Sequence, residues 1–333
     1  MHKKQIDVIL PFHREDQYLR DAISSLNQSE GVDLRILLID TRNEHNQGKP
    51  INIRSSHTIE MINAKSERTY AEAINIGFLH LKNEIFALMN SDDLVHPKRF
   101  IYQINKMEKD QADFSICKFQ KFSKNKKKIS ALGGSPSYSN WRYEYLFFGP
   151  YGADATMVGK SKTIKECKLK FSKYAQADWI FALSHYKKMK LSILPFVGYY
   201  YRMHAKQITR SPDYLEMNSN VIELIKQELA HSGIKVESSL VIQSIAMPYS
   251  KPRLSNSELK ILSQFISKFI EIFSDTNEKE IKKLLARRII FISFFNRKLF
   301  KVEKRLWRFI LTELFRISFE LITSRPRIKL PLK

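Results

Sequence analysis

Short apolar runs alternate with segments of helical periodicity through the first hundred residues, and this pattern restricts the possible folds more than any other feature. The apolar runs predict four strands, at residues 6–12, 35–40, 58–62 and 85–89. Apolar positions at helical spacing predict helices at 16–28 and 69–82, and Pro97 stands at a favoured first-turn position of a further helix. Repeated alternation of this kind is typical of a doubly wound, mostly parallel α/β sheet.

The length and composition of the chain fit one large domain with a second part attached. The chain has 333 residues, of which 43% are hydrophobic and 27% charged, as in folded globular proteins. Its two cysteines are Cys117 and Cys167, so a disulfide framework is not expected and a reducing compartment fits. Residues 1–4 lead into the first strand rather than a signal peptide, and no run of about 18 uncharged apolar residues predicts a spanning helix.

The chain carries a net charge of +22, and the excess is concentrated at its C-terminal end. Residues 281–333 contain 15 Lys and Arg against three Glu, a net charge of +12, together with aromatic and aliphatic residues at helical spacing. This pattern favours a helix that lies on an anionic membrane surface. A helical bundle with a solvated basic face is the alternative. Nucleic-acid binding is not expected, because no helix-turn-helix, zinc-finger or RNA-binding signature is present.

Asn90-Ser91-Asp92-Asp93 follows the fourth apolar run and is the first candidate site. Open α/β sheets place their chemistry beyond the carboxyl ends of the strands, which is where these residues fall. Two adjacent carboxylates repel each other unless a cation lies with them, and a divalent ion carrying a diphosphate meets that need. The alternative is a solvated Asp-rich turn that caps the next helix.

Two other predicted strands also end in residues of interest, Pro11-Phe12-His13 and Asp40-Thr41. Three strand ends that converge on one crevice are typical of a nucleotide pocket at a topological switch point. Asp40 could accept the N3–H of a uracil there, or it could cap a turn. Neither a GxGxxG nor a Walker GxxxxGKS/T motif occurs, so phosphate binding in this chain depends on metal and side chains.

Six segments, in order along residues 6–209, resemble the motifs of family 2 glycosyltransferases with the GT-A fold. They are IDVILPFH at 6–13, LLIDT at 37–41, YAEAINIG at 70–77, NSDD at 90–93 with Pro97 after it, YAQADW at 174–179 and YRMHAKQIT at 201–209. The chain departs from the family pattern at four places. The second Asp and the Gly-Ser after Asp40 are missing, Asn90 replaces the first Asp of the DxD motif, Ala177 stands where Glu is common, and Thr69 replaces a glycine.

The resemblance implies a GT-A catalytic domain at residues 1–212, followed by an α-helical, basic region at 213–333. It implies an inverting glycosyltransferase, of hexosyl or N-acetylhexosaminyl type, that takes a sugar from a nucleotide-diphosphate donor, expected to be a UDP-sugar. The expected acceptor is a hydroxyl of a glycan or lipid-linked glycan in the biosynthesis of cell-surface polysaccharide, capsule or lipopolysaccharide. With the basic tail, this predicts a cytoplasmic enzyme held peripherally on the inner face of the cell membrane.

The same resemblance assigns roles to individual residues. Asp178 is expected to be the general base that takes the acceptor's proton, and Asp92 with His204 is expected to hold Mn²⁺ or Mg²⁺. Nine residues are expected to contact the nucleotide-sugar: Pro11, Phe12, His13, Asp40, Arg68, Asn75, Asn90, Ser91 and Asp93. The structural alternatives are a helix cap for Asp178 and a surface histidine for His204.

Two other kinds of function stay open. A nucleotidyltransferase has a similar α/β core and a metal-bound diphosphate, but its usual Gly-rich first loop followed by Arg and Lys is missing here. A catalytically inactive, membrane-bound partner of a glycan-assembly complex would keep the fold without turnover. The motifs leave the donor sugar, the acceptor, the linkage and the oligomeric state open, and transfer or hydrolysis of a nucleotide-sugar separates the three functions.

Overall fold

The computed structural model divides the chain into two compact units. The first unit comprises the described residues within Met1–Arg142 and Pro150–Tyr214, and the second those within Tyr143–Gly149 and Leu215–Arg327. The described residues are 3–43, 45–46, 49–64, 69–123, 128–134, 146–147, 153–172, 176–204, 219–246, 253–273, 285–286, 288–289 and 292. The second unit also includes a short earlier segment, of which Leu146 and Phe147 are described.

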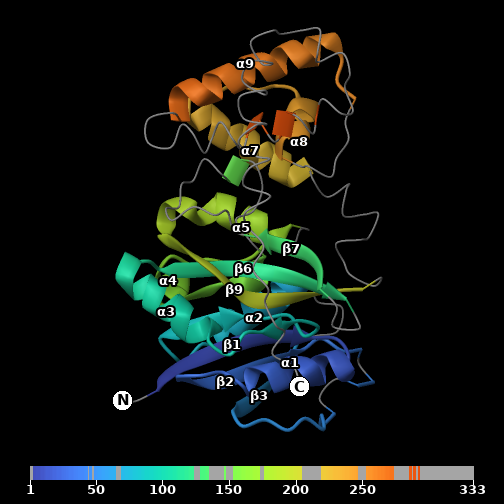
Figure 1. The fold of residues 1–333 in the computed structure, drawn as a ribbon, viewed down its shortest axis with the longest axis vertical. Coiled ribbons are helices and arrows are strands. Elements are labelled where there is room, and N and C mark those ends of the chain that lie inside the picture. Colours follow the sequence, from blue (N-terminus) through green and yellow to red (C-terminus); the bar gives the residue numbers. More distant parts are fainter. Residues whose placement is uncertain are drawn as a thin grey trace. The chain divides into compact units, whose positions relative to one another are not determined.

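Four parallel strands form the first half of the sheet in the first unit (Figure 1), and they confirm the predicted strands. They are β1 (Lys4–Phe12), β2 (Val32–Asp40), β3 (Thr58–Asn63) and β4 (Ile85–Leu88). Their spatial order is β3-β2-β1-β4, so β1 lies between β2 and β4. Phe12 pairs with Asp40 and Ile9 pairs with Leu88, which brings the carboxyl ends of three strands to one edge.

The second half of the sheet mixes directions. Its strands are β5 (Leu94–Val95), β6 (Phe114–Ser123), β7 (Lys128–Gly134), β8 (Val158–Lys160) and β9 (Leu191–Met203). Strand β8 is antiparallel to both β4 and β6, whereas β9 runs parallel to β6 and antiparallel to β5. The pairing of β5 with β9 matters most for function, because it brings the end of β9 beside the residues that follow β4.

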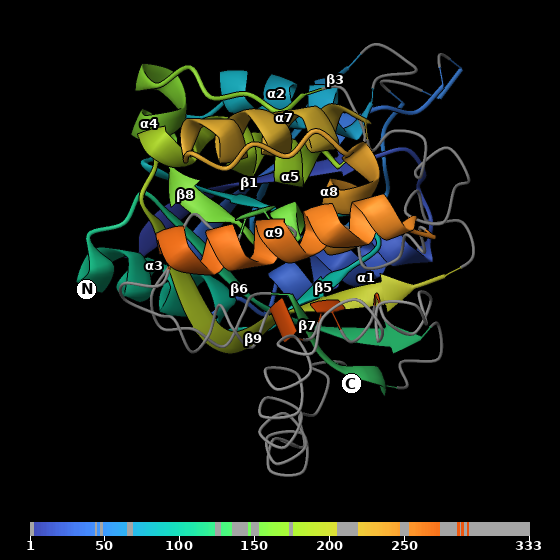
Figure 2. The same cartoon turned by 90° about the horizontal axis from the view of Figure 1, so that it is seen from above.

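Helices cover both faces of the sheet, and their starts follow from capping residues. They are α1 (Gln17–Leu26), α2 (Tyr70–Leu79), α3 (Arg99–Asp110), α4 (Ser161–Glu166) and α5 (Ala177–His185). Asp16 accepts hydrogen bonds from the first-turn amides of α1, and Thr69 with Glu72 forms a capping box that starts α2. Figure 2 shows α2 on one side of β1 and α1 with α3 on the other.

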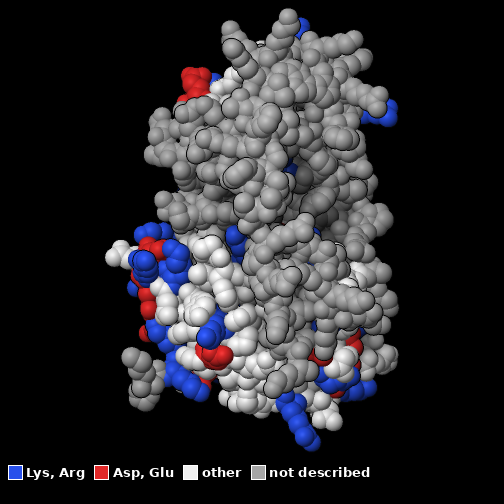
Figure 3. All heavy atoms as spheres, in the orientation of Figure 1, with Lys and Arg blue, Asp and Glu red and all other residues white. Residues whose placement is uncertain are grey.

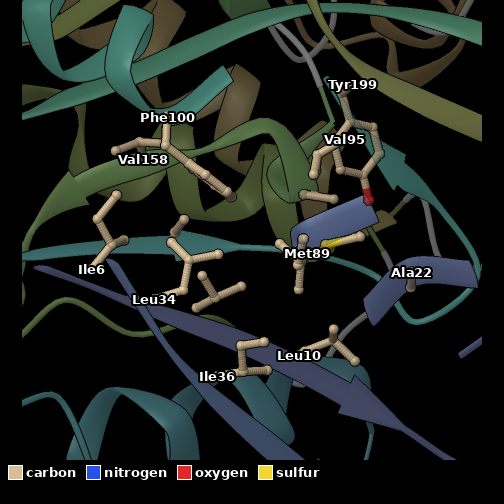
Figure 4. Close-up of a cluster of buried hydrophobic side chains, with 14 of the residues drawn as sticks. Ile6, Leu10, Ala22, Leu34, Ile36, Met89, Val95, Phe100, Val158 and Tyr199 are labelled. Atoms are coloured by element: carbon tan, nitrogen blue, oxygen red, sulfur yellow. The ribbon is translucent and has the colours of Figure 1, made fainter. Parts of the chain in front are cut away.

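The main core lies between the sheet and the α1–α3 face, because alternate strand residues point to opposite faces. Ile6 and Leu10 of β1 point into this core with Ile36 of β2, Ala22 of α1 and Phe100 of α3 (Figure 4). Ile9 of β1 points to the other face and packs against α2. At full burial each large aliphatic side chain stabilises the fold by about 1.5–3 kcal/mol.

Gly77 of α2 packs directly on Ile9, so we predict that Gly77→Ala destabilises the first unit. A Cβ at Gly77 would lie 2.9 Å from Ile9 Cδ1 and closer still to Cγ2, and Ile9 is fully buried. Overpacking of this kind costs about 1–3 kcal/mol, measurable as a lower urea midpoint. Leu79→Ala is the control, since Leu79 lies on the same helix but is 85% exposed. An unchanged midpoint for Gly77→Ala would contradict the prediction.

The second unit is helical in its described part, as expected for the C-terminal region. Its helices are α7 (Ser219–His231), α8 (Ser239–Ala246) and α9 (Asn256–Phe273). Helix α8 packs against α7 and α9, and Phe147 packs edge-on against Phe269 with ring centroids 5.9 Å apart. None of the helices formed by the described residues is long and apolar enough to cross a membrane.

The basic tail predicted at 281–333 lies outside the described residues, apart from 285–286, 288–289 and 292. On the described part of the face shown in Figure 3, basic and acidic side chains are interspersed. The described surface also holds ion pairs such as Lys106–Asp110 and Lys160–Asp113. The charge excess of the chain therefore does not form one basic patch on that part of the face.

Candidate active site

The candidate site lies where β1, β4 and β9 end, within the first unit. Residues 90–93 connect β4 to the short strand β5, and His204 directly follows the end of β9 at Met203. Because β5 pairs with β9, the Asp92–Asp93 turn and the end of β9 come together across about 110 residues of sequence.

Asp92 and His204 form a carboxylate–imidazole pair at this edge. His204 Nε2 lies 2.8 Å from Asp92 Oδ2, and the Asp92 side chain is 32% exposed. The ring of Tyr18 packs 5.6 Å from the His204 ring, centroid to centroid. His13 is a neighbour as well: burial and then Arg14 lower its pKa, while Asp92 raises it and His204 lowers it. The structure thus brings together both predicted metal ligands and one predicted donor contact.

Asp93 differs from Asp92 in being fully buried. Its Oδ2 accepts hydrogen bonds from the Tyr199 hydroxyl at 2.8 Å and from Asn90 Nδ2 at 3.1 Å, and its Oδ1 accepts one from the Arg202 amide at 2.7 Å. Burial, followed by the charge of Asp92, raises the pKa of Asp93 well above its usual range. Asp93 and Asn90 therefore fix the shape of the turn, and their predicted contact with the donor stays a prediction.

A cleft of about 440 Å³ lies beside the ends of β1 and β2, where the nucleotide pocket was expected. It is lined by His13, Arg14, Glu15, Arg42, Asn43 and Asn46. Asp40 itself is buried, and Arg42 donates to it from Nε at 2.9 Å and from Nη2 at 2.8 Å. The ion pair was not predicted, because nothing in the sequence distinguishes Arg42 from other basic residues.

Several predicted donor contacts have mainly structural surroundings. Pro11 and Phe12 are buried in β1, so their side chains belong to the core. Asn75 joins α2 to the segment before α5: its Nδ2 donates to the Phe171 carbonyl and its Oδ1 accepts from the Phe171 amide, both at 2.8 Å. Ser91 lies in the turn after β4, and Arg68 lies outside the described residues. Donor binding by these residues stays a prediction.

Asp178, the predicted base, lies in the first turn of α5 and is half-buried. Its Oδ1 accepts a hydrogen bond from the Trp179 amide at 2.8 Å. Burial raises the pKa of Asp178 to about 6, and burial with the nearby Asp178 charge raises that of Asp154 to about 7. Burial and the same two carboxylates also raise the pKa of Tyr70 well above its usual range.

Asp154 and Tyr70 were not predicted as site residues. Asp154 begins a 3₁₀ turn, η2 (Asp154–Thr156), and Tyr70 begins α2. Of the two, only Tyr70 could have been noticed in the sequence, because it is the first residue of a segment that resembles a family motif. A carboxyl group that titrates near neutral pH is suited to general-base chemistry, so this carboxylate pair could accept a proton at physiological pH.

The residues fit a divalent cation in type, although the protein supplies few ligands. Asp92 and His204 provide one carboxylate and one imidazole, and no group of three or more His, Cys, Asp or Glu gathers among the described residues. Cations that act on diphosphates commonly use one or two protein ligands and take the rest from phosphate oxygens and water. The pair could therefore complete such a coordination with a bound diphosphate.

Comparison with known proteins agrees with this fold. Residues 7–162 match the family model for glycosyl transferase family 2. The structure of residues 1–349 of S. aureus TarS in complex with UDP-GlcNAc is similar, with a TM-score of 0.54 and 12% identity over 89% of this chain and 90% of that one. The longer S. aureus TarS structure gives a TM-score of 0.52 at 12% identity, and there the match covers 88% of this chain and 55% of that one. No curated protein matches the sequence.

The fold and the family match define a glycosyltransferase with a nucleotide-sugar transferase architecture. The mixed sheet with helices on both faces and helices after it is the expected GT-A arrangement. Residues 7–162 of this chain thus resemble glycosyl transferase family 2.

Proposed function

We propose that this glycosyltransferase moves a hexosyl or N-acetylhexosaminyl group, with inversion, from a UDP-sugar to a hydroxyl of a glycan or lipid-linked acceptor. The Asp92–His204 pair at the converging strand ends carries the proposal, because it lies beside a cleft large enough for part of a nucleotide. UDP-GlcNAc in the TarS complex supports the choice of nucleotide. Synthesis of cell-surface polysaccharide, capsule or lipopolysaccharide is the proposed role.

In the proposed reaction the acceptor oxygen attacks the anomeric carbon while the bond from that carbon to the diphosphate breaks. Asp178 takes the proton of the acceptor hydroxyl, and the nucleoside diphosphate leaves with the bonding electron pair. Burial keeps the proton affinity of Asp178 high, and the Asp178 charge in turn adds to the raised pKa of the neighbouring Asp154. When bound by Asp92 and His204, Mn²⁺ or Mg²⁺ would neutralise charge on the leaving diphosphate, and the imidazole suits Mn²⁺ better.

A donor panel tests the proposal directly. The full-length protein is incubated with UDP-, GDP- and dTDP-sugars of both hexose and N-acetylhexosamine types, with Mn²⁺ or Mg²⁺, and release of nucleoside diphosphate is measured. Release from a UDP-sugar supports the proposal. Release of pyrophosphate from a nucleoside triphosphate and a sugar phosphate would favour a nucleotidyltransferase. Donor binding without turnover, across a range of glycan acceptors, would favour an inactive partner.

We also propose that the basic tail holds the enzyme at an anionic membrane surface on the cytoplasmic side. The expected result is that full-length protein sediments with anionic vesicles at low salt and less at high salt, because the Debye length shrinks from about 8 Å at physiological ionic strength to about 3 Å at 1 M. Removal of residues 281–333 should release the protein, and neutral vesicles are the control. Full-length protein that ignores anionic vesicles at every salt concentration would contradict the prediction.

A further inference from the structure

Arg202 is a buried cation of β9 that contacts both the turn after β4 and helix α1. Its side chain is 1% exposed. Its Nε donates to the Asp92 carbonyl at 2.6 Å, and its backbone amide donates to Asp93 Oδ1 at 2.7 Å. Its Nη2 donates to Asp21 Oδ2 of α1 at 3.0 Å. One residue thus connects β9, the Asp92–Asp93 turn and α1.

Aromatic rings and a second polar side chain restrain this arrangement. The Arg202 guanidinium lies 4.4 Å from the centroid of the Tyr18 ring and 4.9 Å from that of Phe122. Gln17 Nε2 donates to Asp21 Oδ1 at 2.9 Å, which orients the carboxylate toward Arg202. Because the guanidinium is planar and its donors point in fixed directions, these contacts determine where the Asp92 carbonyl lies.

Arg202 affects the position of the two proposed metal ligands, Asp92 and His204, through the backbone. Arg202 holds the main chain of Asp92, and two residues further along the chain, just past the end of β9, His204 meets the Asp92 carboxylate at 2.8 Å. Buried ion pairs often add little to stability, because desolvation offsets the attraction between the charges. A role in fixing geometry therefore explains Arg202 better than a role in stability alone.

We propose that Arg202, oriented by Asp21, is a positioning residue that holds Asp92 and His204 at the spacing needed to bind a divalent cation with a nucleoside diphosphate. This inference rests on the proposed function of the Asp92–His204 pair. Arg202 does not contact the ligand itself. Residues that orient metal ligands typically change metal affinity by about 10- to 100-fold when they are replaced.

The test measures the Kd of Mn²⁺ for the full-length protein by titration calorimetry, with saturating UDP and, in a second series, GDP. Arg202→Lys keeps the charge but loses the planar fork, and Asp21→Asn is nearly isosteric at a partly exposed position. We expect both variants to bind Mn²⁺ about 10- to 100-fold more weakly. In turnover assays the Mn²⁺ concentration for half-maximal rate should rise, while kcat at saturating Mn²⁺ stays near that of the wild type.

Arg35→Met is the matched control. Arg35 also pairs with a buried carboxylate, Asp7, at 3.3 Å, but it lies five residues before the end of β2. This variant should keep wild-type Mn²⁺ affinity even where its Tm falls. Wild-type affinity in both Arg202→Lys and Asp21→Asn would overturn the inference and leave the proposed function standing. Failure of the wild type to bind Mn²⁺ in either series would overturn the proposed metal site and the inference with it.

Discussion

Asp178→Asn is expected to lower kcat by about 10²-fold or more while the Kd of the donor stays near the wild-type value. The change is nearly isosteric, and it removes the carboxylate that would accept the acceptor's proton. Turnover is measured as release of nucleoside diphosphate in the presence of acceptor, and donor binding is measured separately by calorimetry. Asp33→Asn is the control, because Asp33 makes an exposed ion pair with Lys3 at the start of β2. Wild-type kcat in Asp178→Asn would assign the proton to another group.

The pH dependence of the rate provides a second test of Asp178 as the general base. A general base must be deprotonated, and burial raises the pKa of Asp178 to about 6 and of Asp154 to about 7. The rate should therefore rise as the pH increases through 6 to 7 and level off above. The stability of the fold changes with pH in the opposite direction. Because the pKa values of Asp178 and Asp154 are higher in the folded protein than in the unfolded chain, the folded state binds protons more tightly. The free energy of unfolding therefore falls between about pH 4 and 7 as the two carboxyls ionise. Because Asn does not ionise, Asp178→Asn should have a Tm at pH 8 equal to or above that of the wild type, which separates loss of the base from loss of the fold.

Asp92→Ala is expected to abolish metal-dependent turnover and to remove Mn²⁺ binding in the presence of UDP. The carboxylate is one of only two protein ligands in the proposed site, so its loss leaves His204 alone. Because Asp92 is partly exposed, the truncation leaves no buried group to destabilise the fold, and the Tm should change little. His57→Ala, a substitution at the opposite end of the sheet beside the Leu34 amide, is a suitable control. Full activity in Asp92→Ala, or activity that a chelator does not reduce, would remove Asp92 from the metal role.

The sequence predicted the part of the fold that depends on local periodicity. The strands at β1, β2, β3 and β4 and the helices α1 and α2 were located from apolar spacing and caps. Helix α3 begins at Arg99, two residues after Pro97, since the chain turns once more before the helix starts. Strand β5 could not be predicted, because two residues carry no periodicity and its pairing with β9 depends on residues a hundred positions away.

In the candidate site, too, the contacts between residues far apart in the sequence could not be predicted. Asp92 stood out because it follows an apolar strand, whereas its pairing with His204 came only from the family resemblance. Asp154 had no signal, since a single Asp has many structural uses and its proximity to Asp178 arises from tertiary packing. The partner of Asp40 was missed for a related reason: a basic residue two positions away gives no indication of whether it points toward the carboxylate.

The return of β9 to the edge of β4 also constrains the order in which this protein acquires its chemistry during synthesis. His204 contacts Asp92 across 112 residues, and Arg202 contacts Asp21 across 181. Contacts of such separation form late, because closing long loops costs entropy before the contact repays it. A nascent chain that has emerged only as far as α5 therefore has Asp178 and the acidic turn but still lacks Arg202 and His204, which contact Asp21 and Asp92 in the folded protein. The proposed donor binding should therefore appear only once β9 and His204 have left the ribosome.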